Sequence, residues 1–141
     1  MKNIVCTVCG TIGTFLAAAL GGWDTAIITL VAFMGIDLVT GFIVAWVFHA
    51  SPKTESGGVN SKVSFKGLCK KCVVLLLIVV ANLLDKQTGA SYFRDGVCIA
   101  FMVSELVSIL ENAALMGIPI PKAITKGLDL LRAKQEGDGE Q

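Results

Sequence analysis

Apolar residues are gathered into four long stretches, at 4–22, 25–48, 68–84 and 96–120, with short polar segments between them. A helix needs roughly 20 residues to cross about 30 Å of hydrocarbon. The stretches therefore predict four membrane-spanning helices, at about residues 4–22, 25–48, 66–84 and 96–117. The third is the shortest, and it holds Lys70 and Lys71 near its start. We expect both lysine side chains to reach toward the membrane interface.

The basic residues are distributed unequally between alternate connections. Ten of the twelve lie at the N-terminus, between or at the ends of spans two and three, and in the C-terminal segment: Lys2, Lys53, Lys62, Lys66, Lys70, Lys71, Lys122, Lys126, Arg132 and Lys134. The other two connections hold Lys86 and Arg94. Because Lys and Arg are enriched in cytoplasmic loops, this pattern predicts cytoplasmic N- and C-termini and a cytoplasmic loop at 49–64. We expect the charged residues flanking the short connection between spans three and four to pair with one another.

Composition supports a membrane protein. Hydrophobic residues make up 54% of the chain and charged residues 16%, which leaves too little polar surface for a water-soluble domain. The net charge of +1 does not indicate a basic surface for binding nucleic acid. The lysine clusters are instead placed to meet anionic lipid head groups. No nucleotide-binding loop, nucleophile elbow or zinc-protease motif is present, so we expect neither an enzyme nor a bound cofactor.

Two spans carry polar residues that hydrocarbon does not tolerate cheaply. Asp37 lies near the middle of the second span, where an aspartate costs about 2.5–3.5 kcal/mol and should face protein or water. The fourth span carries five polar residues within an arc of roughly 120°: Ser104, Glu105, Ser108, Glu111 and Asn112. This face is either an internal seam against Asp37 or another helix, or a surface that meets water when subunits assemble.

Small residues recur on one face of the first span, at intervals of four and three: Thr7, Thr11, Thr14, Ala18 and Gly21. Small residues let helices approach closely in lipid, so we interpret this stripe as a packing face, against the same chain or a neighbour. Gly41, four residues after Asp37, is a second packing position.

The first span has an alternative interpretation. Lys2, the apolar run and the alanines at 17–19 also resemble a signal peptide with a small-residue cleavage site. The charge pattern is compatible with both interpretations.

Two cysteine pairs, Cys6 with Cys9 and Cys69 with Cys72, have a spacing used by metal ligands. Each pair lies inside a predicted helix rather than on a turn. We therefore interpret these cysteines as small apolar helix residues and expect no metal.

The fourth span is followed by Gly117, Pro119 and Pro121, which end the helix. Apolar residues at 124, 128 and 131 then predict a short amphipathic helix at about 121–134, on the membrane surface. Residues 1–134 form a single membrane domain in this interpretation, and 135–141 form a disordered acidic tail.

Several blocks of sequence, in order, resemble the toxin-secretion/phage-lysis holin family of Gram-positive bacteria and their phages. They are WD at 23–24, GIDLVTG at 35–41, SK at 61–62, KGL at 66–68, KK at 70–71, NLLD at 82–85, ELVSILEN at 105–112 and GIPIPK at 117–122. The resemblance reaches from about residue 20 to 132.

Similarity to this family implies a holin that accumulates in the bacterial cytoplasmic membrane. There it would assemble with itself into lesions that release a cell-wall endolysin, or a toxin, without necessary direct contact. Two other functions fit the residues. One is a small ion or proton channel or transporter that uses Asp37, Glu105 and Glu111. The other is a structural membrane subunit in which another helix satisfies Asp37.

Overall fold

The computed structural model describes residues 1–137, without the side chains of Leu128, Leu131, Arg132 and residues from 134 onward. It contains five helices: α1 (Lys2–Leu20), α2 (Thr25–Trp46), α3 (Ser61–Thr88), α4 (Phe93–Leu115) and α5 (Lys122–Gly137). The first four are long and apolar enough to cross a membrane. The predicted all-α membrane fold with a short C-terminal helix is therefore confirmed.

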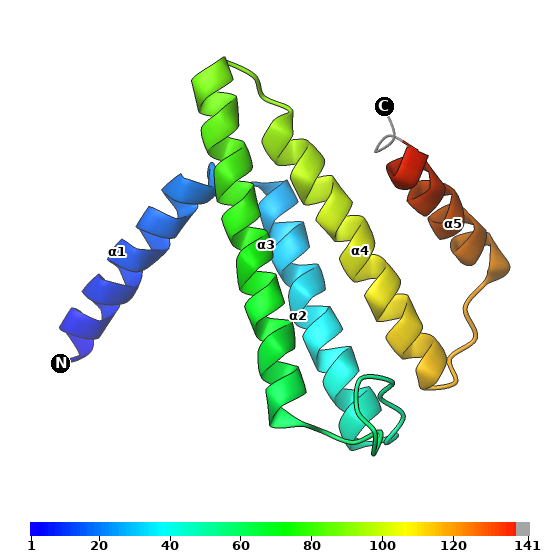
Figure 1. Cartoon of the computed structure of the whole chain (residues 1–141). Helices are drawn as coiled ribbons and strands as arrows, with labels where there is room; N and C mark the ends of the chain where they lie inside the picture. The colour runs from blue at the N-terminus through cyan, green and yellow to red at the C-terminus, as the bar shows by residue number, and fades with distance from the viewer. Residues whose placement is uncertain (138–141) are drawn as a thin grey trace.

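Helices α2, α3 and α4 lie side by side, and α1 diverges from this group (Figure 1). We call the end that holds the α1–α2 and α3–α4 connections the turn end, and the end that holds the 47–60 segment the loop end. Helix α4 packs mainly against α2 and secondly against α3. The C-terminal helix α5 turns back beside α4 (Figure 1).

Polar caps set where the helices begin. The Asp24 carboxylate accepts a hydrogen bond from the Ile27 amide at 3.1 Å and starts α2. The Asn60 side chain accepts from the amides of Lys62 and Val63 and starts α3. This cap places the start of α3 at 61 and not 66, and the helix continues to 88 and not 84. The span predicted to be shortest is thus the longest helix, because its polar ends extend beyond the apolar stretch that identified it.

The main hydrophobic cluster lies in the half of the bundle nearest the turn end. It consists of Leu20, Ile27, Leu30, Met34, Ile78 and Cys98. The buried residues of α3 all belong to this half of the helix, from Ile78 to Asp85. Within 61–77, all of which the structure describes, no residue of α3 is buried. The two halves of α3 are therefore packed very differently.

The connection between α2 and α3 is a folded loop at 47–60, where the sequence predicted 49–64. The Ser51 amide donates to the Gly57 carbonyl at 3.0 Å. Gly57 has a φ of 69°, and a Cβ atom there would lie 1.9 Å from the His49 carbonyl oxygen. Glycine is required at this position because the chain passes too close to itself for a side chain.

Helix α5 runs from Lys122 to Gly137, so residues 135–137 are helical and not part of the predicted disordered tail. The remaining tail, 138–141, lies outside the described residues. The side chains of Leu128 and Leu131, which define the predicted amphipathic face, also lie outside that description.

Candidate functional site

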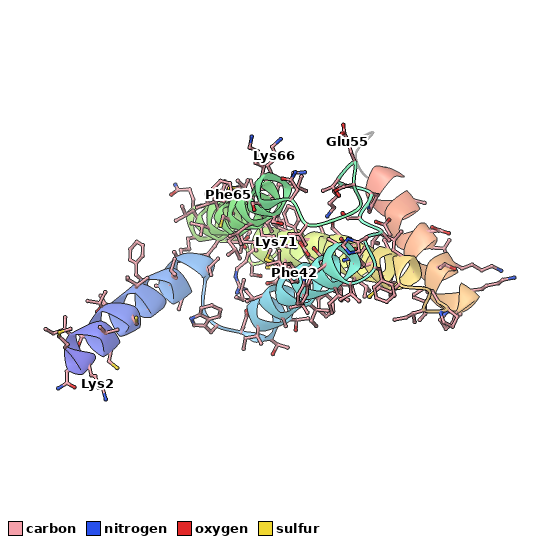
Figure 2. The ribbon with its side chains drawn as sticks, turned by 90° about the horizontal axis from the view of Figure 1, so that it is seen from below. Lys2, Phe42, Glu55, Phe65, Lys66 and Lys71 are labelled. Carbon is pink, nitrogen blue, oxygen red and sulfur yellow. The ribbon has the colours of Figure 1, made fainter. Side chains whose placement is uncertain are left out.

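An ion triad joins the three packed helices. The Lys71 ammonium of α3 donates to the Asp37 carboxylate of α2 at 2.8 Å and to the Glu105 carboxylate of α4. The three side chains are only 11–12% exposed. Figure 2, which looks at the loop end, shows Lys71 directed into the space between these helices. We refer to Asp37, Lys71 and Glu105 as the triad.

The position of Lys71 corrects the expectation that both neighbouring lysines reach for the membrane interface. Lys70 is exposed, whereas Lys71 turns inward to the two carboxylates. Consecutive residues on a helix point about 100° apart, so adjacent lysines cannot both take the same direction. The sequence did contain a signal for this inward direction, because Asp37 and Glu105 lie within predicted spans and need a positively charged partner.

Asn112 extends the polar contacts of α4 toward the loop end. Its side-chain nitrogen donates to the Thr40 hydroxyl at 2.9 Å and to the Asp37 carboxylate at 3.2 Å. Gly41 lies beside it, since a Cβ atom at Gly41 would be 3.6 Å from the same nitrogen. The structure thus brings Asp37 and Gly41 against the polar side of α4.

The five polar residues predicted on one face of α4 divide into two groups. Glu105, Ser108 and Asn112 are half-buried or buried, whereas Ser104 and Glu111 are exposed. We call Asp37, Glu105, Ser108 and Asn112 the polar seam. Its internal position matches the first of the two interpretations of this face, and exposure to water on assembly stays a prediction. Val107, which the helical period placed on the opposite side, is also buried.

A cavity of about 680 Å³ adjoins the triad at the loop end. Its floor includes Asp37 and Lys71, and α3 contributes Val63, Ser64 and Gly67 to one wall. Apolar side chains of α2, the end of α4 and the 47–60 loop complete the lining, together with Ser108, Glu111 and Asn112. The cavity therefore lies between the first turns of α3 and the facing parts of α2 and α4.

A second polar network, which we call the clamp, fixes the turn end. The Arg94 guanidinium donates to the Leu20 carbonyl at 2.6 Å and to the Asp24 carboxylate at 2.7 Å. The Asn82 side chain donates to the Ala19 carbonyl at 2.9 Å. Residues from α3 and α4 thereby hold the last turn of α1 and the first residue before α2.

Charge pairing at the turn end differs from the prediction that residues of the α3–α4 connection pair with one another. Arg94 bonds its neighbour Asp95 at 3.2 Å, but its shorter contact is to Asp24, before α2. Asp85 accepts hydrogen bonds from the amides of Phe93 and Arg94 and so caps α4. The Arg94 hydrogen bond holds the pKa of Asp24 at about 2, below its ordinary 3.8.

The predicted small-residue stripe lies on helix α1, which diverges from the bundle (Figure 1). Thr7, Thr11, Thr14 and Ala18 are exposed, and each threonine hydroxyl donates to the carbonyl four residues earlier at 2.8 Å. Gly21 does not extend this face, because it lies beyond the helix as its left-handed cap with a φ of 86°. Packing of the stripe against a neighbouring chain therefore stays a prediction.

The end of α1 is built into the bundle. Leu20 is 5% exposed within the hydrophobic cluster, and the Ala19 and Leu20 carbonyls accept bonds from the clamp. Cleavage after Ala19 would remove the Asn82 contact with the Ala19 carbonyl, whereas Leu20 and its contact with Arg94 would stay on the remaining chain.

The four cysteines of the two predicted pairs are exposed, on α1 and α3, and Cys98 is buried in α4. Within the described residues, no group of three or more His, Cys, Asp and Glu side chains is arranged to hold a metal ion. Each exposed pair lies on the surface of a helix long enough to cross a membrane.

Comparison with known proteins places this arrangement in a family. Residues 14–133 match the bacteriophage holin family. The chain is 33% identical to an uncharacterised protein of Clostridium perfringens strain 13, over 93% of this chain and 94% of that protein. It is 30% identical to a probable holin of Bacillus phage phi105, over 75% of this chain and 70% of that protein.

No solved structure matches the chain. The family match covers α2, α3 and α4 completely, and with them the triad, the polar seam and the clamp. This multi-pass, four-span chain belongs to the bacteriophage holin family.

Proposed function

We propose that this protein is a holin, which oligomerises in the bacterial cytoplasmic membrane and forms lesions that let an endolysin or a toxin reach the cell wall. The observation that carries this proposal is the holin-family match over residues 14–133, together with the similarity to a phage protein named a probable holin. The holin family is not a family of enzymes, and the chain acts in this proposal by assembling with itself.

The arrangement of the helices supports this function. Helix α1 leaves the bundle and is exposed over nearly its whole length. Its apolar residues are available to lipid and to other copies of the chain. The polar seam supplies groups that water can satisfy if the helices separate during assembly. An assembling pore needs both a surface for packing and a surface that tolerates water.

The proposal is tested by controlled expression in a Gram-positive host together with an endolysin that lacks an export signal. Expression of this chain should stop growth abruptly, and the culture should then lyse because the enzyme crosses the membrane. The endolysin alone should leave the culture intact. Continued growth and intact cells, with the chain present in the membrane at an equal level, would remove the holin function.

A small ion channel or transporter is the second candidate, and the triad with its adjoining cavity is the observation that favours it. The two functions differ in the size of what crosses. An endolysin fused to a folded reporter protein should still reach the wall through a holin lesion. An ion channel would depolarise the membrane and retain the fusion in the cytoplasm.

A further inference from the structure

The packing of α3 changes abruptly along its length. Its half near the turn end contributes Ile78, Ala81, Asn82 and Asp85 to the buried interior. Its half near the loop end, at 61–77, contributes no buried residue, although the structure describes all of it. That half borders the cavity through Val63, Ser64 and Gly67. Val74 and Leu75 of this segment are partly buried against the hydrophobic cluster, whereas residues 61–73 make few packing contacts that would oppose movement.

Lys71 crosses this loosely packed region. Its ammonium forms ion pairs to α2 through Asp37 and to α4 through Glu105, and its side chain is 12% exposed. The Asp37 carboxylate is thus held on both oxygens, one by Lys71 of α3 and the other by Asn112 of α4. Lys71 therefore both holds the loop-end half of α3 in place and offsets part of the negative charge of the two acids.

The turn end has the opposite character. There the clamp joins α1, α3 and α4 through Asn82, Asp85 and Arg94, and the hydrophobic cluster lies close by. Movement of the loop-end half of α3 would leave these contacts unchanged. The chain has the parts of a hinge, with a fixed end and an end held by a polar bridge.

We propose that Lys71 is a latch: its ion pairs to Asp37 and Glu105 keep the loop-end half of α3 against α2 and α4, and their release uncovers the polar seam for assembly. This inference rests on the proposed holin function for its role in lysis. The movement itself is independent of that function, and the two are tested separately.

The first test measures the movement in proteoliposomes. The central variant combines Asp37→Asn, Lys71→Met and Glu105→Gln, which removes the ion pairs without leaving a bare charge. Spin labels at positions 64 of α3 and 115 of α4, which both line the cavity, report the distance between these helices in chains diluted with unlabelled protein. We expect a short distance between the labels in the parent, and a longer mean distance with a broader distribution in the neutral variant. Labels at exposed positions 83 and 99, near the turn end, should give the same distance in both.

The second test measures lysis timing with the co-expressed endolysin. The neutral variant should shift lysis onset to earlier times, because its seam is uncovered without breaking ion pairs. Lys70→Met, at the neighbouring exposed lysine, is the matched control and should lyse at the parental time. A cysteine at position 108 should become reactive to a thiol reagent at lysis onset in the parent and before it in the neutral variant.

The latch is overturned if the 64–115 distance is the same in parent and neutral variant. It is also overturned if the neutral variant accumulates equally and lyses at the parental time. With either result, normal lysis by the parent would still support the holin function. Failure of the parent to release endolysin, with a longer 64–115 distance in the neutral variant, would instead remove the holin function and keep the latch.

Discussion

At the scale of single residues, Gly21 is the glycine at the turn end that the side chains of α3 and α4 crowd most closely. This residue adopts a φ of 86°, and a Cβ atom added there would lie 2.6 Å from the Asn82 side-chain oxygen and 2.8 Å from the Arg94 Nε. Both neighbours belong to the clamp, so neither can move without losing a hydrogen bond to α1. Gly21 is therefore needed for its shape as well as for its backbone conformation.

We expect Gly21→Ala to destabilise the protein by about 1–3 kcal/mol through overpacking, in addition to the backbone strain. Gly22→Ala is the matched control, because Gly22 also has a positive φ, of 110°, but open space around it. Thermal unfolding in detergent micelles, followed by circular dichroism, measures both variants. Equal losses for the two would show that strain alone matters and that the contacts with Asn82 and Arg94 do not.

At the scale of the helices, the sequence predicted the number, order and type of elements because each apolar stretch is long enough to cross a bilayer. It also predicted that Asp37 must face protein or water, and the structure places that side chain against Lys71 and Asn112. The direction of Lys71 was missed, since hydropathy identifies a span without fixing how the helix is rotated. Gly21 was missed as a cap for a similar reason, because interval counting takes no account of where a helix ends.

The contact between α2 and α4 yields a prediction about pH. Asp24 caps α2 and pairs with Arg94 of α4, which holds its pKa at about 2, below the ordinary 3.8. A depressed folded-state pKa means that folding favours the ionised form. The stabilisation is complete above about pH 4 and is lost as the pH falls toward about 2. Because the side chain is 48% exposed, solvent screening keeps it to about 1 kcal/mol or less.

Asp24→Asn tests this prediction, because asparagine retains the cap and removes the charge. Above about pH 4 the parent should be more stable than the variant, and the difference should disappear as the pH approaches about 2. Chemical unfolding in micelles across this range measures it. Asp95→Asn removes the more exposed carboxylate next to Arg94 and should have the smaller effect at neutral pH. A parent–variant difference that stays constant down to pH 2 would remove the ion pair as its cause.

At the scale of the whole molecule, the two ends differ in how they are held. The turn end combines the hydrophobic cluster with the clamp, whereas the loop end combines the cavity with the triad. Removing one partner of a buried ion pair costs about 3–5 kcal/mol because the other charge is left buried and uncompensated, so each charge of the triad depends on the others. Both ion pairs of the triad depend on one residue, Lys71. Because the two ends are held differently, it matters for the proposed function which end faces the cytoplasm.

The distribution of charge predicts the orientation of the chain in the membrane. Ten of the twelve basic residues belong to the N-terminus, the region from Lys53 to Lys71 and the C-terminal segment. Since Lys and Arg concentrate on the cytoplasmic side, we expect the loop end, with its cavity and triad, to face the cytoplasm. The turn end would then face outward, and the clamp would lie at the outer interface.

Cysteine labelling in intact cells before lysis onset tests this orientation. The native cysteines are replaced first, including the buried Cys98, and the resulting chain must still insert. A membrane-impermeant maleimide should then label Ser91→Cys, in the α3–α4 connection, and should not label Glu55→Cys, in the 47–60 loop. Both positions are exposed, so the difference reports the side of the membrane and not burial. Labelling of position 55 with protection of position 91 would invert the molecule and place the latch outside. Labelling of both only after permeabilisation, at equal rates, would mean that the α3–α4 connection does not reach the outer surface.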